Sequence, residues 1–241
     1  MRVIGNTDPN WNERLWRYFK TARFIWTLEN SRLYFAASTQ FTDPFEGATA
    51  VLPPDFPVDP RYGEMEGVER AFFAVRPFKK INCWHRADYE SDAMWKLYAA
   101  ESKGVAVCTT PERMRAAIKP FRLRPDYGVE DLWAGPVSYY DLMNVRLRHH
   151  NNDLYFAKHA AFSWEKEFRL LISLVNALEN GVDPPVSGIE VDVDLGALIE
   201  RIVLGPKLVP DERNLIVEAT RRLGLGDRLC KSSLLGQPRF I

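Results

Sequence analysis

The chain has 241 residues, and its 32 Lys plus Arg balance 32 Asp plus Glu, so the formal net charge is zero at pH 7. Hydrophobic residues make up 46% and charged residues 27%, which is globular usage and excludes a disordered or fibrous protein. No block of five or six like charges occurs, so the sequence carries no strong signature of nucleic-acid binding.

Three cysteines, Cys83, Cys108 and Cys230, are odd in number and far apart, which favours neither a disulfide framework nor a thiolate zinc site. The first ten residues lack an apolar segment of signal-peptide length. No run approaches the roughly 18 apolar residues that would span a bilayer. We therefore expect a cytoplasmic protein without membrane association.

Alternating or short apolar runs predict strands along the whole chain, at 15–19, 33–37, 81–85, 104–108, 137–140, 167–172, 189–193 and 201–204. Helical spacing predicts helices at about 24–29, 65–74 and 154–162, one that Ser91 caps and Gly104 ends, one that Pro111 opens, and one that Asp211 caps and Gly224 ends. The order shows no regular βαβ alternation. We expect an α+β fold with a single mixed, largely antiparallel sheet and flanking helices.

The length suits one domain over residues 1–241. Four prolines, at positions 53, 54, 57 and 60, prevent regular structure and predict an exposed Pro-rich excursion at about 48–62. Just before it, Thr42–Gly47 reads as an ordered turn, because proline moves Asp43 out of the helical region and glycine ends the turn.

The most informative local pattern is Trp164–Arg169, where Glu165, Glu167 and Arg169 would share one face of a strand at period two. Two neighbouring carboxylates repel one another, so one is held protonated or is fixed by Arg169 or Lys158. Such a pair can act as a base or stabilise a cationic centre. The alternative is an exposed face of self-neutralising charges.

Because alternation sends the two glutamates away from the core face, we expect Glu167→Gln to change stability by no more than about 0.5 kcal/mol. A buried ion-pair partner would instead cost about 3–5 kcal/mol.

Several common motifs are absent from the sequence, including phosphate-binding glycine loops and the Gly-x-Ser-x-Gly elbow. Two sets of residues could supply metal ligands but lack a known metal-site spacing, and they are His149, His150 and His159, and Cys83, His85 and Asp88. We predict no metal site.

Short blocks in a fixed order resemble domain of unknown function family 2971. These blocks are Leu15–Tyr18, Leu33–Phe35, Asp43–Gly47, Trp95–Tyr98, Gly104–Val105, Lys158 with Phe162, and Trp164–Glu167 with Arg169, and they span about residues 15–205. Thr42 stands where that family commonly has Asn. The family has no settled activity, and its occurrence in bacteria and their phages suggests bacterial defence or stress.

A more distant resemblance is to the ADP-ribosyltransferase fold, carried by Arg17 with Tyr18, by Ser38–Gln40, and by Glu165–Glu167. Gln40 departs from that fold's pattern. The resemblance implies NAD as a substrate, with no covalently bound cofactor. It implies that Glu167 contacts the ribose hydroxyl and stabilises positive charge, while Glu165 orients or deprotonates the acceptor.

The same resemblance implies that Arg17, with Tyr18 beside it, binds an NAD phosphate or ribose and that Ser38 positions the nicotinamide ribose. Lys158 and Arg169 would complete the binding residues. Trp84, Trp95 or Tyr98 could stack on a ring of the substrate, and the alternative for these three is an aromatic core cluster. We also expect the turn residues Asp43, Phe45 and Glu46 to pack beside the 165–169 strand.

Whether the protein is an enzyme is open at this stage. One hypothesis is transfer of ADP-ribose from NAD to a macromolecular acceptor, or NAD hydrolysis. A second is a non-catalytic module that binds a ligand or partner, which the absence of a strong catalytic signature favours. A third is a carboxylate-based hydrolase or nuclease that uses Glu46, Glu165 and Glu167.

Overall fold

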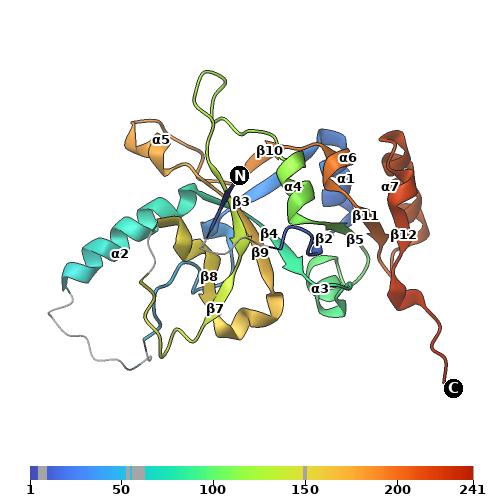
Figure 1. Ribbon diagram of the computed structural model, residues 1–241, viewed down its shortest axis with the longest axis horizontal. Helices are drawn as coiled ribbons and strands as arrows, with labels where there is room; N and C mark the ends of the chain where they lie inside the picture. The colour runs from blue at the N-terminus through green and yellow to red at the C-terminus, as the bar shows by residue number, and fades with distance from the viewer. Residues whose placement is uncertain (5–9, 53–54, 56–62, 149–150, 241) are drawn as a thin grey trace. The chain divides into compact units, whose positions relative to one another are not determined.

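The computed structural model describes residues 1–4, 10–52, 55, 63–148 and 151–240. These residues form an α+β fold (Figure 1) in which ten strands belong to one mixed sheet, while β7 (Ser138–Tyr140) and β8 (Ala157–His159) form a separate pair. The predicted fold class is confirmed. Most of the predicted Pro-rich excursion at 48–62 lies outside the described residues.

The chain divides into two compact units, each built from three stretches of sequence. The first comprises Met1–Pro9, Tyr34–Cys83 and Pro120–Glu190, and the second comprises Asn10–Leu33, Trp84–Lys119 and Val191–Ile241. Three strands cross the boundaries between these stretches, namely β3 (Arg32–Ala37), β4 (Lys79–Arg86) and β10 (Ile189–Asp192). One domain over the whole chain stays a prediction.

The first unit is organised around β9 (Glu167–Ser173), which runs antiparallel to β6 (Leu132–Pro136). On the far side of β6 lies β1 (Arg2–Val3), in parallel. Ile81, Tyr155 and Leu171 form part of a core cluster in this unit. The helices among the described residues of the unit are η1 (Ser38–Gln40), α2 (Gly63–Val75), η3 (Arg76–Phe78), η4 (Asn151–Phe156), η5 (Ala160–Glu165) and α5 (Val175–Glu179).

In the second unit β5 (Val105–Thr109) is buried along its whole length between β2 (Leu15–Phe19) and β11 (Arg201–Leu204), antiparallel to both. The parallel strand β12 (Leu229–Lys231) follows β11. Helix α1 (Thr21–Asn30) packs beside α7 (Pro210–Arg222), and α4 (Pro111–Ala117) beside α6 (Leu195–Leu198). The unit also contains α3 (Asp92–Tyr98), η6 (Gly226–Arg228) and η7 (Ser233–Leu235).

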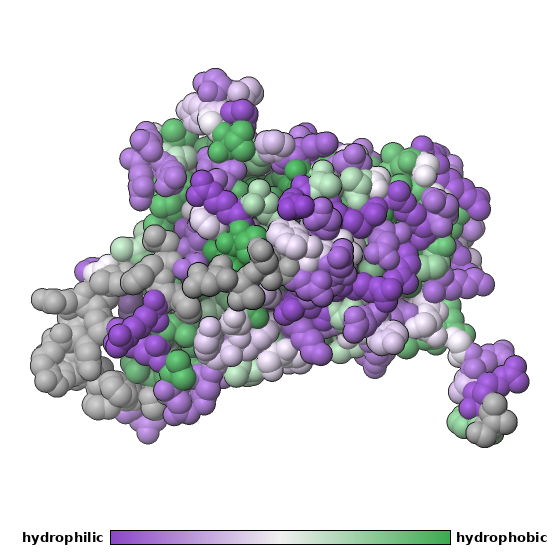
Figure 2. All heavy atoms as spheres, viewed as in Figure 1, coloured by the Kyte–Doolittle hydropathy of each residue, from purple (hydrophilic) through white to green (hydrophobic). Residues whose placement is uncertain are grey.

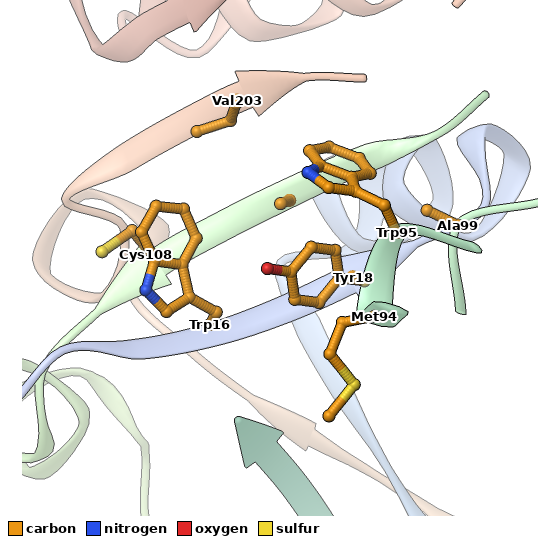
Figure 3. Close-up of a cluster of buried hydrophobic side chains, with 8 residues drawn as sticks. Trp16, Tyr18, Met94, Trp95, Ala99, Cys108 and Val203 are labelled. Carbon is orange, nitrogen blue, oxygen red and sulfur yellow. The ribbon is translucent and has the colours of Figure 1, made fainter. Parts of the chain in front are cut away.

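Aromatic side chains fill the core of the second unit (Figure 3). The ring of Tyr18 meets that of Trp95 edge to face, with centroids 5.1 Å apart. Trp16 and Cys108 lie beside them, from two neighbouring strands. This cluster contains two of the seven tryptophans of the chain.

Two predicted helix boundaries and one predicted helix are wrong. Helix α3 ends at Tyr98, well before Gly104, because Ala100, Glu101 and Ser102 take positive φ angles that a helix cannot contain. Asp211 lies in the first turn of α7, whose cap is Val209. The predicted helix at 154–162 is instead η4, β8 and η5 in succession, because the middle residues pair with β7.

Gly104 does matter, as the residue that lets β5 approach β2. A Cβ atom at this position would lie 1.9 Å from the carbonyl oxygen of Phe19, a backbone atom that has no room to move. We therefore expect Gly104→Ala to lower the free energy of unfolding by about 1–3 kcal/mol or more, the usual cost of overpacking. Urea unfolding checks this, with Gly128→Ala as the control because its Cβ would meet nothing within 4 Å.

None of the described helices is both long and apolar enough to cross a membrane. On the face seen in Figure 2, hydrophobic side chains are scattered among hydrophilic ones wherever the residues are described. Scattered apolar side chains are normal on a protein surface and do not by themselves mark an interface.

Candidate functional site

The turn after β3 carries two carboxylates toward β9 within the first unit. Asp43 Oδ1 accepts a hydrogen bond of 2.9 Å from the backbone N–H of Phe45, which is the local bond that shapes such a turn. Gly47 closes the turn at a φ of 78°, a left-handed angle that glycine adopts without strain. The side chain of Glu46 is completely buried and contacts Arg169. The predicted packing of this turn beside the 165–169 segment is confirmed.

Arg169 holds the inner part of the site and is fully buried. Its Nε donates to Glu167 Oε2 at 2.6 Å, and its two terminal nitrogens donate to Glu46 at 2.5 and 3.0 Å and to Glu167 Oε1 at 3.2 Å. The fifth N–H donates to the carbonyl of Tyr155 at 2.7 Å. All five guanidinium donors are therefore used, and in this arrangement Arg169 has none left for a ligand.

Lys158, on β8, is the cation in the outer part of the site. Its Nζ donates to Glu165 Oε2 at 2.5 Å and to Glu167 Oε1 at 2.9 Å, and it lies 3.7 Å from Asp43 Oδ2. The ring of Phe162 lies 4.6 Å from the same ammonium group. A cation surrounded by three carboxylates and an aromatic face is well stabilised. Although burial lowers the pKa of Lys158, the adjacent Glu167 carboxylate raises it overall.

The site we call the carboxylate cluster thus contains four acids and two bases. Its members are Asp43, Glu46, Glu165, Glu167, Lys158 and Arg169. With every group ionised its net charge is −2, from four negative and two positive side chains. Such an excess in a buried place favours protonation of one acid.

Of the two neighbouring glutamates, Glu165 is the one whose protonated form is favoured. Burial and a hydrogen bond with Glu167 raise the pKa of Glu165 to about 7. Burial would also raise the pKa of Glu167, but Arg169 and Lys158 hold it well below its usual value. The two neighbouring carboxyls therefore differ in protonation near neutral pH, and only Glu165 can exchange a proton readily there.

The structure corrects the predicted geometry of the Glu-x-Glu element. Glu165 is the last residue of η5, and β9 begins only at Glu167. Between them Lys166 takes a left-handed conformation, with φ 43° and ψ 54°. Glu167 and Arg169 do share a face of β9, as predicted, but Glu165 reaches the cluster from a turn.

The expectation that the glutamates avoid the core is wrong. Relative exposure is 8% for Glu165 and 6% for Glu167, and both are ion-paired. We therefore expect Glu167→Gln to lower the free energy of unfolding by about 3–5 kcal/mol, the cost of removing one partner of a buried ion pair. The alternative of an exposed, self-neutralising face is excluded by this burial.

Exposure increases from the inside of the cluster outward. The side chains of Arg169 and Glu46 are 0% exposed, those of Lys158 and Asp43 5%, and that of Glu165 10%. The most accessible carboxyl is thus the one whose pKa is near 7. Phe45 stands at the edge of this group, with its ring 5.2 Å from that of His159.

The other predicted site residues do not join this cluster within the first unit. Ser38 is fully buried, and its hydroxyl donates to the carbonyl of Arg76 at 2.8 Å, so it offers no free hydroxyl to a ribose. The residues that fall in the second unit are Arg17, Tyr18, Trp84, Trp95 and Tyr98.

Of these five, Tyr18, Trp84 and Trp95 are buried. For the two tryptophans this agrees with the alternative prediction, an aromatic cluster in the core. The indole N–H of Trp95 donates to Glu90 at 2.7 Å, and the guanidinium of Arg17 lies 5.8 Å from the Trp84 ring. Tyr98 is 48% exposed, whereas Trp84 and Trp95 are buried.

Sequence reasoning missed Tyr139. Its hydroxyl oxygen accepts a hydrogen bond of 2.8 Å from the backbone N–H of Glu167. The strand at 137–140 was predictable from its residues, but the pairing of β7 with β8, which sets Tyr139 opposite Lys158, was not. No local pattern signals a contact between strands so far apart along the chain.

Comparisons of the chain with protein-family models, with curated proteins and with solved structures found no match. The resemblances to family 2971 and to the ADP-ribosyltransferase fold stay predictions. Within the described ranges, no group of three or more His, Cys, Asp or Glu side chains has an arrangement that could hold a metal ion.

Proposed function

We propose that the first unit carries an acid–base site that cleaves the bond between ribose and nicotinamide in NAD, by hydrolysis or by transfer to an acceptor. The observation that carries the proposal is the pair of nearly buried carboxyls, Glu165 and Glu167, that both accept hydrogen bonds from Lys158 Nζ. Their surroundings raise the pKa of Glu165 to about 7 and hold that of Glu167 well below its usual value. A general base is most effective when its pKa lies near the working pH. Bacterial defence or stress as the setting rests on the family resemblance alone.

The negative excess of the cluster suits this reaction. When the C1′–N bond breaks, its electron pair goes to the nicotinamide nitrogen, which becomes neutral, and positive charge develops on the ribose. The ionised Glu167, held by Arg169 and Lys158, would stabilise that charge electrostatically. Water or an acceptor hydroxyl then bonds to C1′, and its proton passes to Glu165.

This scheme fixes the expected pH dependence of NAD cleavage. Nicotinamide leaves without needing a proton, so the reaction needs Glu165 ionised rather than protonated. Since the pKa of Glu165 is about 7, we expect kcat/KM to rise tenfold per pH unit well below pH 7 and to level off above it. Release of nicotinamide, followed between pH 5 and 9, measures this.

Two results of the same experiment would count against the proposal. A rate that falls as pH rises through 7 would make Glu165 a proton donor, which suits a neutral glycoside and not NAD. Absence of NAD cleavage at every pH would remove the proposed activity. Glu179→Gln serves as the control, because Glu179 is exposed and stands outside the carboxylate cluster.

The low exposure of the cluster favours one second candidate, a non-catalytic module that binds a ligand or partner. Its most accessible carboxyl is only 10% exposed, so the ion pairs could serve chiefly to fix the 43–47 turn to β9. Such a module would melt at a higher temperature with NAD or another ligand but would not consume it. A rise in melting temperature with magnesium or manganese, and none with NAD, would favour the carboxylate-based nuclease.

A further inference from the structure

A second pair of side chains in the first unit has the geometry of a nucleophile and its base. Ser173 is the last residue of β9 and Lys79 is the first residue of β4, two neighbouring strands of the sheet. The backbone N–H of Leu174 donates to the carbonyl of Phe78 at 2.9 Å, which holds the two chain segments side by side. Lys79 Nζ then lies 2.9 Å from Ser173 Oγ.

Lys79 is a buried lysine whose two hydrogen-bond partners are both neutral. Its exposed fraction is 6%, and its Nζ donates to Asn152 Oδ1 at 2.8 Å as well as to Ser173. The charged group that acts on it is Glu179 of α5, and the ring of Tyr155 on η4 lies 5.8 Å away. Burial outweighs the effect of Glu179 and lowers the pKa of Lys79 to about 8. A useful fraction of the amine is therefore neutral near neutral pH and can accept a proton.

Ser173 and Asn152 complete the arrangement of a base-activated serine. Ser173 is partly exposed whereas Lys79 is buried, so the nucleophile is the more accessible member of the pair. A neutral amine has two N–H groups and one lone pair. Asn152 Oδ1 accepts one N–H and orients the amine, and the lone pair can accept the hydroxyl hydrogen of Ser173. A serine whose proton passes to an adjacent base is an activated nucleophile.

The neighbouring Lys80 shows that a lowered pKa alone does not make such a site. Lys80 is also buried, and burial lowers its pKa to about 8 as well. Its Nζ donates to the carbonyls of Pro77 at 2.6 Å, of Pro185 at 2.5 Å and of Ser187. All three N–H groups are thus used by backbone carbonyls, which are not nucleophiles. What distinguishes Lys79 is the hydroxyl beside it.

From this geometry we propose that Ser173 and Lys79 form a second catalytic site, which cleaves carboxylic esters through an acyl-serine intermediate. Ser173 Oγ bonds to the carbonyl carbon of the ester while its proton passes to Lys79 Nζ. The bond to the alcohol oxygen then breaks, and the alcohol leaves with that proton. Water removes the acyl group from Ser173 by the same two proton transfers, which restores both residues. None of these steps involves NAD or the carboxylate cluster.

Phenylmethanesulfonyl fluoride tests the nucleophile in the full chain, because attack by an activated serine forms an Oγ–S bond and releases fluoride. We expect mass spectrometry to find the label on Ser173, and we expect labelling to stop hydrolysis of p-nitrophenyl acetate. Ser173→Ala should abolish both reactions, whereas Ser138→Ala, at an exposed serine of β7, should preserve both. Absence of label on Ser173, or ester hydrolysis that persists in the labelled protein, overturns the inference.

The rate of labelling tests the role of Lys79. Arginine keeps the charge and the hydrogen-bond donors but cannot lose its proton, so Lys79→Arg should slow labelling by at least about 100-fold. In the natural chain the rate should rise tenfold per pH unit below pH 8 and level off above it, since the neutral amine is the active form. A profile without this inflection, which needs no variant, overturns the assignment of Lys79 as the base. So does a folded Lys79→Arg protein that is labelled at the natural rate.

Discussion

Replacing Arg169 with Met should lower the free energy of unfolding by about 3–5 kcal/mol, the same range that we expect for Glu167→Gln. Methionine has a similar length but no charge. The substitution would leave Glu46 and Glu167 buried without the five hydrogen bonds that Arg169 provides around them. Glu167 would keep its ion pair with Lys158, but Glu46 would lose the one with Arg169, so the 43–47 turn should also detach from β9.

Urea unfolding at pH 8 measures this loss. Arg222→Met is the matched control, because Arg222 pairs with Glu218 on the exposed side of α7 and such pairs contribute little. We expect the control to stay within about 0.5 kcal/mol of the natural protein. A loss below about 1 kcal/mol for Arg169→Met would show that the cluster does not hold the turn.

Glu165→Gln should lower the rate of NAD cleavage by about 10²- to 10⁴-fold, the usual contribution of a general base. Glutamine keeps the shape of the side chain and an oxygen that can accept from Lys158 Nζ. It has no group that can take a proton from water or an acceptor. Nicotinamide release under saturating NAD at pH 8 measures the effect.

This variant should also lose the rise in kcat/KM through pH 7, since the group that titrates there is gone. A folded Glu165→Gln protein that cleaves NAD at the natural rate would show that another residue is the base. Unfolding measurements on the same sample separate a lost base from a lost fold.

The sequence was sufficient to predict that the 43–47 turn and the 165–169 segment meet, but not how deeply they are buried or which other predicted residues stay apart from them. Asp43–Gly47 and Glu165–Arg169 stand out as blocks, and the structure brings them together. Their burial was not predictable, because Glu, Lys and Arg side chains are seldom buried unless they form ion pairs. Here the ion pairs join residues that are far apart in the sequence. Glu46 and Arg169 are 123 positions apart, so no periodicity connects them.

For residues 154–162 the sequence predicted the wrong kind of element. Their apolar spacing is helical, yet Ala157–His159 forms β8 because β7 offers a strand to pair with. Tertiary pairing overrides local preference in short segments. Because residues 157–159 form a strand rather than a helix, Lys158 lies opposite Tyr139. The wrong helix prediction and the failure to predict Tyr139 therefore have the same cause, the pairing of β7 with β8.

The way the two units are divided along the chain bears on the order in which they can form during synthesis. The first unit has all of its stretches once Glu190 has left the ribosome, whereas the second still lacks its last stretch, Val191–Ile241. Translation at about 5–20 residues per second separates these moments by several seconds. At the start of that interval β2 and β5 are already made but β11, which pairs with β5, is not, so until Leu204 is made one edge of β5 leaves its backbone N–H and C=O groups unpaired by a strand.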